Sequence, residues 1–146
     1  MGHGKRILAL DYGKRNIGLA CCDELGVTVQ PLPSIPNLGL KSMLQTLRST
    51  IARLGIGELV LGIPLNMDGT RGESARQMEQ LMGVLKAELM LPLVGVDERL
   101  STVEATELWQ NMNSRQQKKY KTVDSLAAAF ILQRYLGERQ TCDAHC

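Results

Sequence analysis

Acidic residues occur at three points where predicted elements begin or end. Asp11 directly follows an apolar run at 7–10, Asp97 and Glu98 follow a second predicted strand, and Asp124 falls in the first turn of a predicted helix. Polar residues at the ends of buried strands are frequent functional positions. Neighbouring residues of an extended segment point to opposite sides, so we expect only one of Asp97 and Glu98 to face a shared site.

Three carboxylates brought together repel one another unless a cation joins them, and Mg²⁺ or Mn²⁺ prefers oxygen ligands. Two such ions could activate water and stabilise the departing oxygen of a phosphodiester. Both histidines, His3 and His145, lie in the terminal segments. Metal-bound water is therefore the expected nucleophile, in place of a histidine general base.

Each acid also has a purely structural interpretation. Asp11 could begin the turn before Gly13, and 97–99 could be a solvated charged loop. Acids such as Asp124 are favoured near helix N-termini by the helix dipole. However, Asp124 shares a helical face with Ala127, which would turn it inward toward the sheet.

Basic residues lie near these acids and could contact phosphates. The candidates are Lys14, Arg15, Arg99, Lys118, Lys119 and Lys121. The last three belong to a polar stretch at 113–121, which could equally be a solvated loop between helices. The net charge of +2 neither requires nor excludes a polyanionic partner, and an aromatic content of 3% gives little support to a platform of stacked aromatic rings.

The hydrophobic pattern predicts the elements that position these residues. Apolar runs predict strands at 5–11, 16–23, 27–30, 58–63 and 93–96. Helical spacing predicts a helix at 40–54, two opened by capping boxes at Thr70/Glu73 and Ser101/Glu104, and a last helix at 122–136. Short links make the first three strands antiparallel, and helical crossovers make the later ones parallel. We expect an α/β fold with a mixed five-stranded sheet and helices on both faces.

The 146 residues suit one domain, expected at 1–137 and followed by a polar C-terminal tail at 138–146. No apolar run approaches the ~20 residues that span a bilayer, and the N-terminus does not resemble a secretory signal. The expected location is therefore the cytoplasm, without membrane association. Cys142, His145 and Cys146 lack the second half of a zinc site, so we expect the four cysteines to be reduced thiols.

Four segments, in order, are similar to motifs of one known family. They are 10–18, 62–70, 97–105 and 123–125. The chain resembles the YqgF-type family of Holliday-junction-resolvase-like proteins, also described as pre-16S ribosomal RNA nucleases. The resemblance covers nearly the whole chain, and four ordered motifs are far more specific than one.

The resemblance implies a ribonuclease-H-like fold and phosphodiester hydrolysis that depends on Mg²⁺ or Mn²⁺. By motif position, the acidic set of the family corresponds to Asp11, Glu98 and Asp124. The loop after the fourth strand corresponds to 64–70, where Asn66 and Asp68 would shape the site or touch substrate. The expected role is maturation of the 5′ end of pre-16S ribosomal RNA, which would involve RNA and pre-ribosomal particles.

Alternative functions remain open at this point. A Holliday-junction resolvase would act on branched DNA, and a non-catalytic nucleic-acid-binding or ribosome-assembly factor would retain the fold alone. A resolvase that cuts two strands symmetrically needs two sites and hence a homodimer, whereas an RNA-processing nuclease could be a monomer. Actin-like and sugar-kinase-like ATPases also begin with an Asp-x-Gly turn, but they need two such domains, and 146 residues supply one.

Overall fold

The computed structural model describes residues 6–64, 70, 72–98, 101–120 and 122–145, with side chains at all of these except 101–103, 119, 120 and 139–145. The strands are β1 (Arg6–Tyr12), β2 (Asn16–Cys22), β3 (Val29–Pro36), β4 (Ile56–Ile63) and β5 (Leu93–Asp97). The helices are α1 (Leu40–Leu54), α2 (Glu73–Leu89), α3 (Ser101–Gln110), α4 (Ser114–Tyr120) and α5 (Val123–His145). In the part of the chain so described, no helix is long and apolar enough to cross a membrane.

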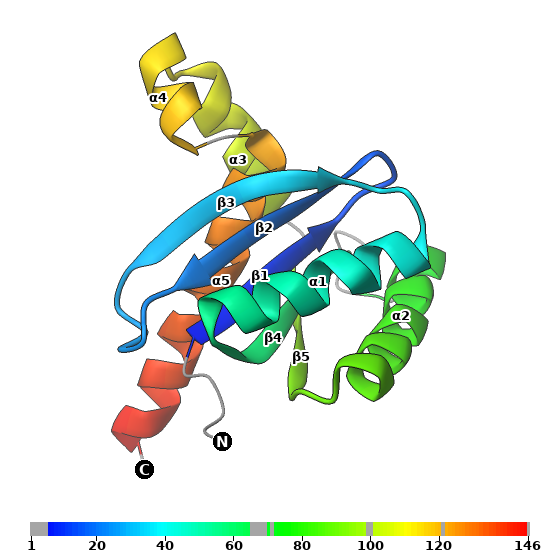
Figure 1. Ribbon diagram of the computed structural model, residues 1–146. Helices are drawn as coiled ribbons and strands as arrows, with labels where there is room; N and C mark the ends of the chain where they lie inside the picture. Colours follow the sequence, from blue (N-terminus) through cyan, green and yellow to red (C-terminus); the bar gives the residue numbers. More distant parts are fainter. Residues whose placement is uncertain (1–5, 65–69, 71, 99–100, 121, 146) are drawn as a thin grey trace.

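The five strands form one mixed sheet in the order β3-β2-β1-β4-β5 (Figure 1). β1 pairs antiparallel with β2, and β2 pairs antiparallel with β3. β1 pairs parallel with β4, and β4 pairs parallel with β5. The predicted ribonuclease-H-like arrangement, three antiparallel strands followed by parallel additions, is therefore confirmed.

Helices cover both faces of the sheet, with α1 and α2 on one face and α5 on the other (Figure 1). Side chains of β1 alternate between the two cores: Leu8 and Leu10 pack with α1 and α2, whereas Ile7 and Ala9 pack with α5. A strand that is buried on both faces has no reason to alternate apolar with polar residues, which explains the unbroken apolar run. This central position carries Asp11 to the carboxyl end of the sheet.

β3 is longer than predicted, because it continues to Pro36 instead of ending before Pro31. It is an edge strand, and only one of its sides needs backbone donors for the ladder, so prolines can occupy it. Pro31 lies opposite Ala20 of β2 within the ladder. The prolines also leave the outer edge short of donors for pairing with another strand.

One short helix was not predicted, and two helix boundaries differ from the predicted ones. The stretch at 113–121 contains the short helix α4, opened by a reciprocal capping pair: the Asn113 side chain accepts from the Gln116 N–H at 2.9 Å, and the Gln116 side chain accepts from the Asn113 N–H at 3.0 Å. α2 begins at Glu73 after Gly72, with no side-chain cap, so the predicted Thr70/Glu73 capping box is wrong. α5 continues beyond Leu136 to His145.

Candidate active site

Asp11 and Glu98 meet at the carboxyl ends of the parallel strands. Asp11 follows Ile7 and Ala9 on the face of β1 that α5 covers, and it is only 9% exposed. Glu98 comes one residue after β5, and alternation along this strand from Val96 places it on the same face. The two carboxyl groups lie close enough for a hydrogen bond between them to change the pKa of both.

The backbone of Glu98 is held from two sides. Its N–H donates to the carbonyl of Ile63 at 3.1 Å, which extends the contact between β4 and β5 by one residue. The guanidinium of Arg134, on α5, donates to the carbonyl of Asp97 at 2.6 Å. The carboxylate of Glu98 is therefore placed by the sheet and by α5 together.

Gly62 of β4 leaves the space that the Glu98 carboxyl group occupies. A Cβ at Gly62 would overlap Glu98 Oε2 and lie 2.7 Å from Cδ1 of Ile131 on α5. β4, which lies between β1 and β5, thus has no side chain at the point where Asp11 and Glu98 meet. This gives a physical reason for a glycine in the middle of a buried strand.

The third acid, Asp124, is brought close by Gly18. Gly18 lies directly opposite Asp11 in the β1–β2 ladder. A Cβ at Gly18 would overlap the carbonyl of Asp124, so the first turn of α5 rests on the backbone of β2. The negative charge of Asp124 raises the pKa of Asp11, which reflects their proximity.

The start of α5 is fixed by hydrogen bonds. Thr122 Oγ1 accepts from the Ser125 N–H at 3.1 Å, which caps the helix. The Ser125 hydroxyl, fully buried, donates to the carbonyl of Leu32 on β3. These contacts attach the turn that carries Asp124 to the edge of the sheet.

The pKa of all three acids is raised above its ordinary value. Burial is the main cause in each case. For Glu98, burial, the hydrogen bond to Asp11 and the charges of Asp11 and Asp97 raise the pKa to about 9. For Asp11, the hydrogen bond from Glu98 partly opposes the increase in pKa. Burial and the contact between two carboxyl groups therefore favour a proton that the Asp11–Glu98 pair shares.

This pair fits a divalent cation. Glu98 Oε2 is buried and accepts no hydrogen bond from any described group. A buried carboxyl oxygen without a partner costs free energy, and a hard cation would satisfy it while replacing the shared proton. As the described side chains stand, however, no three of them among His, Cys, Asp and Glu form a group that could hold a metal ion. Asp11 and Glu98 touch directly, whereas Asp124 acts on Asp11 through its charge.

The predicted substrate-binding residues fall into two groups. Lys14 and Arg15 are exposed in the turn between β1 and β2, and Lys118 is exposed on α4. Asn37 fixes that turn by donating from its side chain to the Gly13 carbonyl at 2.7 Å and from its backbone to the Arg15 carbonyl at 2.8 Å. The side chains of Asn66, Asp68, Arg99, Lys119 and Lys121 lie outside the described residues.

A cavity of about 190 Å³ adjoins the acids, and sequence reasoning missed most of it. Its lining is Tyr12, Lys14, Pro64, Ser74, Gln77, Met78 and Glu98. Ser74, Gln77 and Met78 are spaced three and four residues apart on α2, so they share one face of that helix. This spacing is visible in the sequence, but its nearness to Glu98 depends on how α2 crosses the sheet.

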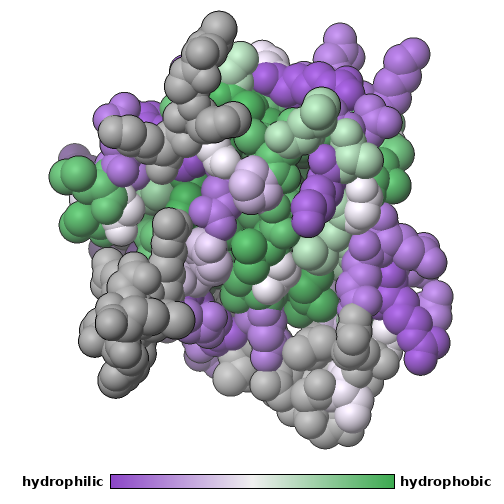
Figure 2. Space-filling model, turned by 90° about the horizontal axis from the view of Figure 1, so that it is seen from below, coloured by the Kyte–Doolittle hydropathy of each residue, from purple (hydrophilic) through white to green (hydrophobic). Residues whose placement is uncertain are grey.

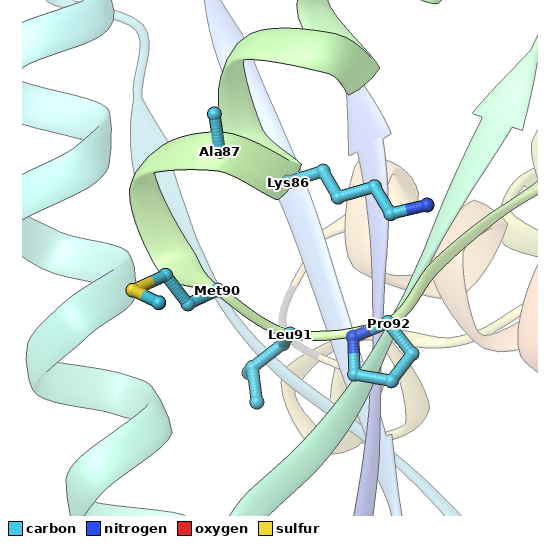
Figure 3. A pocket seen from close by; sticks show the side chains of 5 residues that line it. All are labelled: Lys86, Ala87, Met90, Leu91 and Pro92. Carbon is cyan, nitrogen blue, oxygen red and sulfur yellow. The ribbon is translucent and has the colours of Figure 1, made fainter.

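A larger cavity, of about 580 Å³, lies at the opposite end of the sheet, where α2 leads into β5 (Figure 3). It is lined by Lys86, Ala87, Met90, Leu91 and Pro92. Hydrophobic residues are also displayed on the underside of the molecule (Figure 2). None of the described residues that line this larger cavity carries a carboxylate, so the acids and the smaller cavity mark the candidate active site.

Comparison with known proteins agrees with this architecture. Residues 5–138 match the family described as "RuvX: Holliday junction resolvase". A protein of Lachnospira eligens named "Putative pre-16S rRNA nuclease" is 37% identical over 138 residues, covering 92% of this chain and 99% of its own. A protein of the same name from Geobacillus kaustophilus is 39% identical over 141 residues, with coverage of 92% and 99%.

Among solved structures, the fold is similar to that of T. thermophilus RuvC in complex with a Holliday junction substrate. The TM-score is 0.55 at 13% sequence identity, and the similarity covers 92% of this chain and 95% of RuvC. At this identity the likeness concerns the fold alone. The family match and the two relatives confirm the resemblance drawn from the four motifs, and the chain belongs to the RuvX family.

Proposed function

We propose that this protein is a nuclease that hydrolyses phosphodiester bonds with the help of Mg²⁺ or Mn²⁺, and that Asp11, Glu98 and Asp124 are its acidic set. The observation that carries the proposal is the buried Asp11–Glu98 pair, with one carboxyl oxygen that has no described partner. The proposed nuclease domain occupies 1–137, and the polar segment at 138–146 takes no part in the chemistry.

The chain's own residues have distinct tasks in this scheme. When bound, the ion supplies Lewis-acid stabilisation of the charge that develops on the phosphate. Asp11 and Glu98 would hold the ion in place of the proton that they share, and Asp124 would add negative charge that favours the cation. Lys14, Arg15 and Lys118 contact the phosphate backbone, so affinity for nucleic acid falls as salt is added.

The proposed substrate is the 5′ end of pre-16S ribosomal RNA, met in the cytoplasm on pre-ribosomal particles. The names of the relatives from Lachnospira eligens and Geobacillus kaustophilus support this choice. The description of the matched family supports a second candidate, a resolvase that acts on branched DNA as a homodimer. A cleavage assay that offers both substrates with the same ion separates the two.

The test compares wild-type protein with Asp11→Asn on precursor ribosomal RNA and on a four-way DNA junction, in EDTA and in Mn²⁺. We expect metal-dependent cleavage by wild type and none by Asp11→Asn, which retains the fold. Glu24→Gln, at an exposed position between β2 and β3, is the matched control and should cleave normally. Direct titration with Mn²⁺ should show binding to wild type and loss of binding in Asp11→Asn. Equal cleavage by wild type and Asp11→Asn would contradict the catalytic assignment and favour a non-catalytic factor.

A further inference from the structure

The cavity beside Glu98 combines apolar walls with a polar rim. Tyr12 and Met78 are partly buried and pack on the core formed with α1 and α2. Ser74 and Gln77 are exposed on the first turns of α2, and Lys14 is exposed at the β1–β2 turn. The cavity thus runs from Glu98, over the ends of the strands, to the start of α2.

This lining does not suit a bare phosphate. An anion site needs several cations or converging N–H donors, but Lys14 is the one cation among the described residues of the lining, which also include the acid Glu98. Apolar walls with an amide and a hydroxyl at the rim are instead what proteins use to hold a nucleobase that has left its stack. The Gln77 amide offers both donors and an acceptor, which complement the edge of a base.

Resting on the function proposed above, we infer that this cavity receives the base of an unpaired nucleotide adjacent to the phosphate that is cut. Lys14 holds the phosphate that joins this nucleotide to the strand, while Ser74 and Gln77 contact the base. A base that is stacked and paired in a duplex cannot enter a cavity in the protein, so the cleaved strand is single-stranded at this position. Ser74 and Gln77 are therefore specificity-determining residues.

The test uses an RNA oligonucleotide whose cleavage position has been mapped, and a copy with an abasic site at the nucleotide next to the cut. Loss of a base that is held by a protein lowers affinity by roughly 5- to 150-fold. We expect wild type to cleave the abasic copy slower by such a factor. Gln77→Ala and Ser74→Ala should slow cleavage of the intact RNA about tenfold or more, and should change cleavage of the abasic copy little. Gln80→Ala, exposed on the same helix but outside the cavity, is the matched control.

Two results would overturn the inference while leaving the proposed nuclease intact. One is equal cleavage of intact and abasic RNA by wild type, and the other is equally fast cleavage when the strand is fully paired. If wild type cleaves no RNA at all, the proposed function fails, and the cavity is then judged by binding alone. Fluorescence anisotropy then measures the affinity of Asp11→Asn for the two labelled oligonucleotides. The inference requires that Asp11→Asn binds the abasic copy more weakly than the intact RNA. It also requires that adding Gln77→Ala to this variant removes the difference in affinity.

Discussion

Without a divalent ion, Glu98 lowers the stability of the protein as the pH rises. Its pKa is about 9 in the folded protein, against 4.5 for the ordinary group. Between these two values the folded state binds a proton that the unfolded chain has released. The stabilising contribution is thus fully present below pH 4.5 and is lost as the pH rises toward 9, at about 1.4 kcal/mol per pH unit. Between pH 5 and pH 8, the free energy of unfolding should fall by about 4 kcal/mol from this group alone.

Glu98→Gln tests this reasoning, because an amide has the size of the protonated acid and needs no proton. Whatever the amide costs in packing, that cost is the same at both pH values. The difference in unfolding free energy between variant and wild type should therefore shift by about 4 kcal/mol in favour of the variant from pH 5 to pH 8. Urea denaturation followed by circular dichroism in EDTA measures this quantity. Glu24→Gln, at an exposed position, should leave the pH dependence unchanged.

The same measurement in Mg²⁺ adds a second criterion. An ion that replaces the shared proton should restore stability to wild type at pH 8 and do little for Glu98→Gln. If wild type and Glu98→Gln instead show parallel pH profiles in EDTA, Glu98 is ionised in the folded protein and the proton-sharing pair does not exist.

Three further predictions concern the surroundings of the acids. Gly62→Ala should destabilise the protein by about 1–3 kcal/mol in thermal denaturation and abolish cleavage, because the added Cβ overlaps Glu98 Oε2; unchanged activity would mean that the acid does not occupy this space. Ser125→Ala should lower the free energy of unfolding by about 1–3 kcal/mol in urea denaturation, since it removes the buried donor to the Leu32 carbonyl of β3. An unchanged free energy of unfolding would contradict the hydrogen bond between α5 and the sheet edge. Lys118→Ala should reduce the slope of log affinity against log salt by about one in an RNA-binding titration, whereas an unchanged slope would place Lys118 outside the nucleic-acid interface.

Most of the sheet could be predicted from the sequence because local patterns determine it. Unbroken apolar runs identified the central strands, and loop lengths identified the antiparallel and parallel pairs. β3 was predicted too short because its position at the edge, where prolines are tolerated, follows from the order of the strands and not from its own residues. The α4 helix was missed although Asn113 and Gln116 have the spacing of a capping pair. That signal was present but was outweighed by the polar composition of the stretch.

The sequence predicted which acidic residues form the candidate site, but it did not predict the pKa values of those residues. Alternation along the strand indicated that one of Asp97 and Glu98 faces the site, and the structure places Glu98 against Asp11. The close approaches at Gly18 and Gly62 could not be predicted, because they depend on how α5 crosses the sheet. The shared proton depends in turn on those approaches, since it arises from burial and from the contact of two carboxyl groups.

The placement of α5 has a consequence for the order in which the protein acquires its chemistry. Asp11 lies in β1, whereas α5, which covers the face of the sheet that bears Asp11, follows all five strands in the sequence. A chain still in synthesis therefore presents Ile7, Ala9 and Val60 uncovered and lacks Asp124. Domains fold as units once their elements are available, so the acids assemble only after α5 has been synthesised and released. The proposed nuclease would thus remain inactive on the ribosome until α5 can pack on the sheet.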